Sequence, residues 1–183
     1  MPHIHLPDGA PGISGGFSFR PETAKPMRDL AHVLLHSSAC ASFTSAEREL
    51  VATFVSSRNS CYFCMKSHGA VATHLHGDAG IVDAVCADYS SAPLSAKMKS
   101  LLAIADEVRI DGKRVTKDLV DAALAEGATE VDVHDTILIA SAFCMFNRYV
   151  DGLGTWQPRD ESIYAEMGRQ LADNGYSAPT RRS

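Results

Sequence analysis

The sequence lacks the charge and hydrophobicity patterns of nucleic-acid-binding and membrane-spanning proteins. Its 17 basic and 22 acidic residues are mixed along the chain and give a net charge of −5, without the basic stripe that a nucleic-acid binder usually carries. The longest apolar run, residues 137–146, is interrupted by Ser141 and falls well short of the roughly 20 residues that span a bilayer. The first residues have neither a cationic start nor an apolar core, so no secretory signal is expected. We therefore expect a soluble, cytoplasmic protein without nucleic-acid or membrane partners.

Alternating strand patterns, hairpin turns and low-complexity tracts are also missing from this chain. Its 183 residues, 45% of them hydrophobic, fit one globular domain that buries roughly 70% of the surface of the unfolded chain. From Arg20 onward, nearly every segment has apolar residues at helical spacing. The sequence predicts an all-α, single-domain bundle of about eight helices over residues 20–176. An extended arm, rich in Pro, Gly and Ser, is expected over residues 1–19, and a polar tail over 177–183.

Capping residues place several helix boundaries. Thr44 followed by Glu47 is a capping-box pattern and predicts a helix over about 44–57. Asn59 or Ser60 is expected to cap the next helix, which should stop at Gly77. Other helices are expected to open at Pro21, Asp78, Ser95, Thr116 and Thr129, and a final one to end at Asn174-Gly175.

Two of these helices, the one from Thr44 and the one from Thr129, have no clear polar face. A helix that is apolar on all sides belongs in the middle of a bundle or in a subunit interface. We therefore expect both helices to be buried all round, and the protein to form a homo-oligomer.

The five cysteines are an odd number for a disulfide framework. Cys40, Cys86 and Cys144 stand alone, and we expect each to behave as a small buried hydrophobic residue. Cys61 and Cys64 form the one Cys-x-x-Cys pair of the chain. Without a secretion signal, such a pair is more often redox-active or metal-binding than structural.

Cys61, Cys64 and His68 are spaced to share one face of a helix. A thiol becomes reactive as the thiolate, which a helix start favours and a neighbouring base produces. His68 lies one turn beyond Cys64, and a second thiol three residues back can close a disulfide once the first is oxidised. These are the parts of a dithiol peroxidase or a disulfide exchanger. The simpler interpretation is two packed cysteines beside a core histidine.

Glu49 is a carboxylate on the face of its helix opposite the large apolar residues. Its neighbours on that face are small: Ala46, Ala52, Thr53 and Ser56. Small residues allow another helix to approach closely, so Glu49 is expected either at a helix contact, where it needs a partner, or on the solvated surface. If the bundle brings it to the imidazole described above, it can orient that ring and stabilise its protonated form.

Residues 49–68 resemble the motif of the alkylhydroperoxidase D and carboxymuconolactone decarboxylase family. The motif is a Glu, eleven residues, Cys-x-x-Cys, three residues and a His, and this chain fills its positions with Glu49, Cys61, Cys64 and His68. Residues 143–154, Phe-Cys-Met-Phe-Asn-Arg-Tyr-Val-Asp-Gly-Leu-Gly, are similar to the peroxidase-related branch of that family. The resemblance covers roughly residues 20–155. It implies an all-α fold, no organic cofactor, and a homo-oligomer, most often a trimer or hexamer.

The resemblance also implies a role for each of the four residues. Cys64 would attack the peroxide and become a sulfenic acid, and Cys61 would supply a proton and then form the Cys61–Cys64 disulfide. His68 would be the base, often through a water, with Glu49 behind it in a proton relay. The implied activity is a thiol-dependent peroxidase acting on hydrogen peroxide or organic hydroperoxides. Its partner would be a reductant for the disulfide, for which thioredoxin-like, lipoyl-like and small-thiol donors are all compatible.

Two features of the sequence stand apart from this pattern. The helix dipole alone would activate Cys61, nearer the helix start, whereas the resemblance and the position of His68 favour Cys64. Alkylhydroperoxidase D has a His directly before the second cysteine, and this chain has Phe63. An apolar ring there removes a proton-handling group, which points to a different substrate or weaker activity.

Other functions compete with the peroxidase. Cys61, Cys64 and His68 are also zinc-ligand types, with His74 or His76 as a fourth ligand, although these lie one to two turns further along. The decarboxylase-type lyases of the same family are a second alternative, although a lyase has no need of a redox dithiol.

A binding or assembly module that has lost its chemistry is a third alternative. Asn147 and Arg148 could then serve an interface together with Tyr149 and Trp156. For Asn147 and Arg148 themselves, we expect a structural role at a helix end or a subunit contact.

Overall fold

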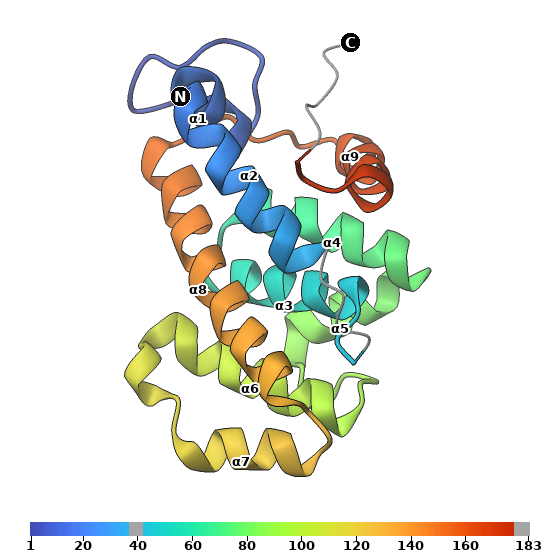
Figure 1. The fold of residues 1–183 in the computed structure, drawn as a ribbon. Coiled ribbons are helices and arrows are strands. Elements are labelled where there is room, and N and C mark those ends of the chain that lie inside the picture. Colours follow the sequence, from blue (N-terminus) through green and yellow to red (C-terminus); the bar gives the residue numbers. More distant parts are fainter. Residues whose placement is uncertain (37–41, 178–183) are drawn as a thin grey trace.

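The computed structural model describes residues 1–36 and 42–177, which form nine α-helices, one short 3₁₀-helix and no β-strand (Figure 1). The all-α fold predicted from helical spacing is confirmed. No helix of the described residues is long and apolar enough to cross a bilayer. The elements are α1 (Ile13–Phe19), α2 (Pro21–Leu35), α3 (Ser45–Arg58), α4 (Tyr62–His76), α5 (Ala79–Asp88), α6 (Ala96–Ile110), η1 (Gly112–Arg114), α7 (Lys117–Ala125), α8 (Glu130–Leu153) and α9 (Glu161–Asn174).

Side-chain caps begin most of the helices where the sequence predicted them. At α3 the Thr44 hydroxyl accepts a hydrogen bond from the Glu47 backbone at 3.3 Å, and the Glu47 carboxylate accepts one from the Thr44 backbone at 2.8 Å. At the C-terminal end of α4, Gly77 adopts the left-handed conformation with φ 70°, as predicted. Helices α5 to α8 are likewise capped by side chains, those of Asp78, Ser95, Thr116 and Thr129.

The expected extended arm is only partly correct, because residues 13–19 form α1. This short helix contains two glycines and has no capping side chain, so its own propensity is poor and packing must stabilise it. Gly16 supplies that packing, since a Cβ at this position would lie 2.3 Å from the Tyr149 hydroxyl on α8. The count of about eight helices is one too low for this reason. Cys40 and residues 178–183 of the expected tail lie outside the described residues.

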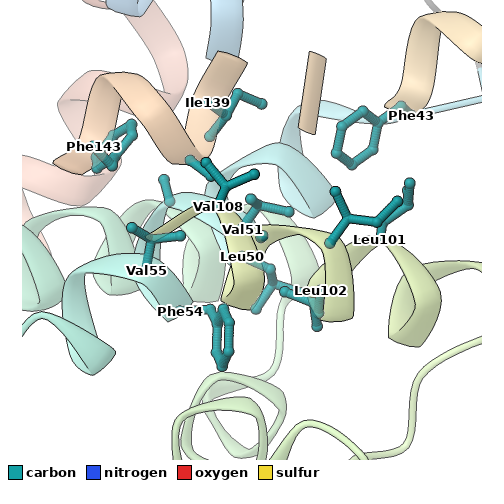
Figure 2. Close-up of a cluster of buried hydrophobic side chains, with 14 of the residues drawn as sticks. Phe43, Leu50, Val51, Phe54, Val55, Leu101, Leu102, Val108, Ile139 and Phe143 are labelled. Carbon is teal, nitrogen blue, oxygen red and sulfur yellow. The ribbon is translucent and has the colours of Figure 1, made fainter. Parts of the chain in front are cut away.

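Helix α3 is the centre of the molecule and packs against α2, α4, α5, α6 and α8. Nine consecutive residues, 48–56, are buried, which confirms that this helix has no solvent face. Figure 2 shows how its apolar side chains meet those of α6 and α8. The labelled members of this core are Phe43, Leu50, Val51, Phe54, Val55, Leu101, Leu102, Val108, Ile139 and Phe143.

Helix α8 differs from its prediction, because one face of it lies open in the single chain. Val131, Leu138 and Met145 are exposed at seven-residue spacing along this face. Burial all round is therefore wrong for α8 within one chain. The physical reason is that the described helices packed on α8, chiefly α3 and α6, leave these three side chains uncovered.

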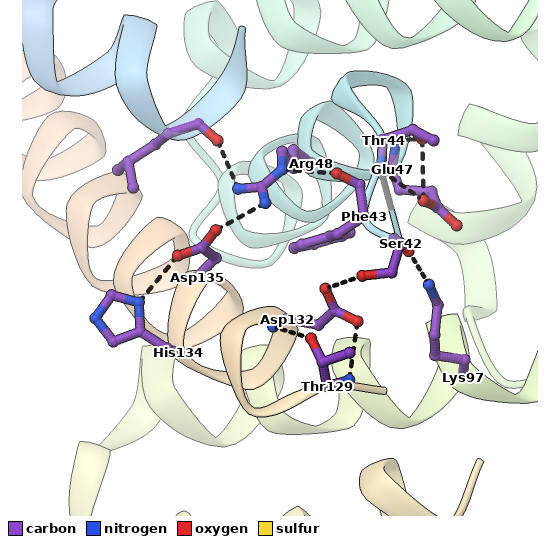
Figure 3. A network of polar contacts seen from close by, with 11 residues as sticks. Ser42, Phe43, Thr44, Glu47, Arg48, Lys97, Thr129, Asp132, His134 and Asp135 are labelled. Atoms are coloured by element: carbon purple, nitrogen blue, oxygen red, sulfur yellow. Dashed lines mark hydrogen bonds and ion pairs between the residues drawn. The ribbon is translucent and has the colours of Figure 1, made fainter. Parts of the chain in front are cut away.

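A buried arginine holds α3 to its neighbours (Figure 3). The Arg48 guanidinium donates to the carbonyl of Phe43 at 2.9 Å, to the carbonyl of Leu34 at 3.0 Å and to the Asp135 carboxylate at 2.7 Å. It also lies over the Phe43 ring, 4.5 Å from the centroid. Because these partners belong to α2, α8 and the turn before α3, Arg48 fixes the position of the helix that carries the neighbouring Glu49.

Candidate active site

The four residues singled out by the motif are brought to one region by the contact between α3 and α4. Glu49 lies in the middle of α3, Cys61 is the N-cap of α4, and Cys64 and His68 follow on the first two turns. The predicted cap, Asn59 or Ser60, is wrong: Cys61 takes this position and its side chain makes no capping hydrogen bond. Ser60 instead turns the chain with a positive φ of 59°.

Glu49 is buried at a helix contact and has two partners. Glu49 is only 1% exposed, and its Oε2 lies 2.8 Å from Nδ1 of His68. The Tyr176 hydroxyl donates to the other carboxylate oxygen, Oε1, at 2.5 Å. The alternative of a solvated Glu49 is therefore wrong. A buried carboxylate needs a partner, and Glu49 has two of them, His68 and Tyr176.

The His68 ring is held on several sides. Its Nδ1 faces Glu49, and the Tyr176 hydroxyl lies 3.1 Å from the same nitrogen. Phe143 contacts the ring edge-on at a centroid distance of 4.6 Å, and Tyr176 stacks on it at 5.6 Å. Since a carboxylate can only accept hydrogen bonds, Nδ1 carries the proton in this contact. Nε2 is then the nitrogen that can accept a proton from a thiol.

Tyr176 is the site residue that sequence reasoning missed. It follows Asn174-Gly175 as the last residue of the domain predicted over 20–176, directly before the polar tail expected over 177–183. An aromatic residue near the end of a domain is a weak signal of a functional role. The residues that Tyr176 contacts on α3 and α4 lie more than a hundred positions earlier in the sequence. A helical spacing pattern cannot indicate contacts of that kind.

The two thiols are buried, at 0% exposure for Cys61 and 4% for Cys64. They pack with Phe63, Val150 and Tyr164 in a small apolar cluster. Phe63 is part of this packing, since its ring contacts Tyr164 edge-on. Gly12 also packs so closely on the Phe63 ring that a Cβ at this position would overlap the ring.

The environment separates the two thiols chemically. A hydrogen bond with the Cys61 side chain is the main cause that lowers the pKa of Cys64, with further contributions from the charge of His68 and a hydrogen bond to Asn147. Burial opposes this lowering. The same Cys61–Cys64 hydrogen bond, together with burial, raises the pKa of Cys61. The arrangement therefore favours the Cys64 thiolate, against the helix-dipole argument, and Cys61 as its hydrogen-bond donor.

Asn147 of α8 belongs to this site as well as to the packing. It is buried, donates to the Ser56 hydroxyl at 3.0 Å and accepts from the Asn59 amide at 2.9 Å. Asn59 also contacts the sulfur of the half-buried Cys144 at 3.6 Å. The structural role expected for Asn147 is thus joined by an effect on the Cys64 thiol, whose pKa it helps to lower.

Arg148 and Asp151 lie on the surface near the end of α8. Arg148 donates to the Cys144 carbonyl within its own helix at 2.9 Å. Burial raises the pKa of Asp151, and a hydrogen bond with the Cys61 side chain lowers it in part. The sequence pattern did not indicate this contact.

The zinc alternative finds no support in the geometry. Among residues 1–36 and 42–177, no three His, Cys, Asp or Glu side chains are grouped closely enough to hold a metal ion. His74, offered as a fourth ligand, lies at the surface with Asp173 3.9 Å from its Nε2.

Comparison with known proteins gives a structural likeness only. Neither a protein-family model nor a curated protein sequence matches the chain. An alkylhydroperoxidase AhpD core described as an uncharacterized peroxidase-related protein, from Ralstonia eutropha, superposes with a TM-score of 0.76 at 23% identity, over 87% of this chain and 81% of that one. An uncharacterized peroxidase-related protein from a Silicibacter species gives the same values.

A third solved structure extends the likeness to a protein of unknown function from Agrobacterium tumefaciens. It is provisionally assigned as the antioxidant defence protein AhpD, and it superposes with a TM-score of 0.67 at 18% identity, over 79% of this chain and 97% of that one. Three solved structures thus share the helical arrangement described above over most of its length. The chain therefore has the alkylhydroperoxidase D-like fold.

Proposed function

We propose that this protein is a thiol-dependent peroxidase that reduces hydrogen peroxide or small organic hydroperoxides at Cys64. The observation that carries the proposal is the buried Cys61–Cys64 pair at the start of α4, on the same helix as the His68 imidazole, whose Nδ1 is bound to a buried carboxylate. The peroxidase-related names of the structural neighbours agree with it. The apolar cluster around the thiols favours an uncharged substrate, and hydroperoxides are uncharged at neutral pH.

The proposed first step is oxidation of Cys64. Its proton passes to Nε2 of His68, directly or through one water, and the thiolate attacks one peroxide oxygen. The S–O bond forms as the O–O bond breaks, and the leaving oxygen takes the proton from His68 and departs as water or an alcohol. Glu49 stabilises the imidazolium between these two transfers.

The second step is closure of the disulfide. The Cys61 sulfur attacks the sulfenic acid of Cys64, the Cys61 proton leaves with the hydroxyl group as water, and the Cys61–Cys64 bond forms. A dithiol reductant then returns two electrons and two protons by exchange with this disulfide. The raised pKa of Cys61 suits the resolving role, because the protonated thiol is the hydrogen-bond donor of the resting state.

Titration of free thiols after an equimolar pulse of hydrogen peroxide tests the proposal. The reduced protein, with five cysteines, should lose two thiols per chain. Cys64→Ser should lose none, and Cys61→Ser should lose one and give a sulfenic acid that dimedone traps. Cys86→Ser, at a half-buried cysteine on α5, is the matched control and should behave as the unaltered protein. Thiol loss in Cys64→Ser equal to that of the unaltered protein would overturn the mechanism.

A further inference from the structure

We propose that Tyr176 is a positioning residue for the Glu49–His68 pair, and that its hydroxyl limits how strongly Glu49 holds a proton on His68. The inference rests on the proposed function, since it concerns the base that serves Cys64. It is carried by a set of contacts that the motif does not include. These contacts link the segment after α9 to α2, α3 and α4.

The carboxylate of Glu49 is shared between two donors. His68 Nδ1 lies 2.8 Å from Oε2, and the Tyr176 hydroxyl lies 2.5 Å from Oε1. Because Glu49 is only 1% exposed, the tyrosine takes the place that water would have on a surface carboxylate. A hydrogen bond to an ionised acceptor stabilises the anion and so weakens its hold on other protons.

The tyrosine ring has a separate effect on the geometry of the imidazole. It stacks on His68 at a centroid distance of 5.6 Å with 21° between the planes, and Phe143 meets His68 edge-on at 90°. Two rings in these orientations fix the plane of the imidazole. The hydroxyl and the ring of Tyr176 can therefore be tested separately.

The backbone before Tyr176 is shaped to deliver this side chain. Gly175 has a positive φ of 68°, and a Cβ there would lie 2.3 Å from Nδ1 of His32 on α2. The Tyr176 backbone N–H donates to the same Nδ1 at 3.2 Å. Burial and the charge of Glu49 raise the pKa of Tyr176 well above its ordinary value, so the hydroxyl stays protonated and remains a donor.

The test is Tyr176→Phe, which removes the hydroxyl and keeps the ring. Two rates are measured between pH 5 and 9: alkylation of Cys64 by iodoacetamide, followed by peptide mass spectrometry, and oxidation of the protein by hydrogen peroxide. Tyr89→Phe, at the end of α5, is the matched control. Circular dichroism melting curves establish that each variant is folded.

The two rates should move in opposite directions. Without the hydroxyl, Glu49 is a stronger base and holds His68 as imidazolium, which favours the Cys64 thiolate. The alkylation profile of Cys64 should therefore shift by about one unit to lower pH. The same imidazolium gives its proton to the leaving oxygen less readily, so oxidation by peroxide should slow by about tenfold. Purely structural damage at the site would not produce this opposite pair of changes.

Two further measurements define what overturns the inference. In a Glu49→Gln background, adding Tyr176→Phe should leave the alkylation profile where Glu49→Gln alone puts it. Should Tyr176→Phe not fold, a nuclear Overhauser contact between the Tyr176 and His68 rings is expected in the unaltered protein, and its absence contradicts the proposal.

An unshifted alkylation profile in folded Tyr176→Phe overturns the role of the hydroxyl. If the unaltered protein consumes no peroxide but the alkylation profile still shifts, the proposed function fails and the role of Tyr176 stands.

Discussion

The difference between the two thiols comes mainly from one hydrogen bond. Cys61 and Cys64 are both buried at the start of α4, yet their pKa values move in opposite directions, chiefly because one sulfur donates to the other. A donor stabilises the thiolate that accepts its proton, so Cys64 gains acidity and Cys61 loses it. The order of the two residues along the helix matters less than this contact.

Replacing Cys61 by alanine should therefore make Cys64 less acidic. Cys61→Ala removes the hydrogen-bond donor that is the main cause lowering the pKa of Cys64. Burial, which raises this pKa, remains, so the pKa of Cys64 should rise by about one unit. Absorbance of the thiolate at 240 nm, titrated against pH, measures the change. Cys86→Ala should leave the thiolate titration of Cys64 in place, and an unchanged midpoint in Cys61→Ala would contradict the hydrogen-bond explanation.

At the same residue scale, the sequence predicted part of the site and not the rest. Cys61, Cys64 and His68 could be grouped because they are close in sequence, whereas Glu49 was grouped with them only by the resemblance of residues 49–68 to the family motif. Tyr176 could not be grouped with them, because its place depends on how the segment after α9 packs against α2. Long-range contacts of single side chains leave no periodic pattern in a sequence.

At the scale of elements, α3 carries the site and Arg48 holds α3 in register with α2 and α8. Its guanidinium is fully buried and each partner would be left without its donor if the side chain were removed. Arg48→Met should lower the free energy of unfolding by about 3–5 kcal/mol, the usual effect of breaking a buried ion pair. Urea unfolding followed by circular dichroism measures the loss.

An exposed arginine is the natural comparison for Arg48. Arg169→Met on α9 removes surface ion pairs with Glu166 and Asp173 and should change the free energy of unfolding by less than about 1 kcal/mol. Equal losses in both variants would mean that the network in Figure 3 has no special part in stability.

The helices themselves could be predicted where local chemistry decides their ends. Thr44, Asp78, Ser95, Thr116 and Thr129 cap their own helices, so their signals are contained in three or four neighbouring residues. Helix α1 and the start of α4 could not be placed in this way. α1 depends on its contact with α8, and Asn59, a plausible cap by residue type, bonds instead to Asn147 on α8.

At the scale of the whole molecule, the open face of α8 supports the proposal of a homo-oligomer. Val131, Leu138 and Met145 recur every seven residues on this face, the spacing at which one helix seam meets another. Leu138→Glu should shift the protein toward monomer, because it places a charge in the centre of the seam. Light scattering coupled to size exclusion measures the mass, and Ile110→Glu, an exposed position on α6, is the control. An unaltered protein that is monomeric at all concentrations would contradict the proposal.

The Tyr176–His68 contact joins residues 108 positions apart, which matters during synthesis. A ribosome adds about 5–20 residues per second, so His68 and both thiols are made about 5–20 s before Tyr176 follows them. In that interval the nascent chain has the dithiol without the last hydrogen-bond donor of its carboxylate. Completion of the contacts among Glu49, His68 and Tyr176 is thus timed by translation of the segment after α9, long after α3 and α4 have been made.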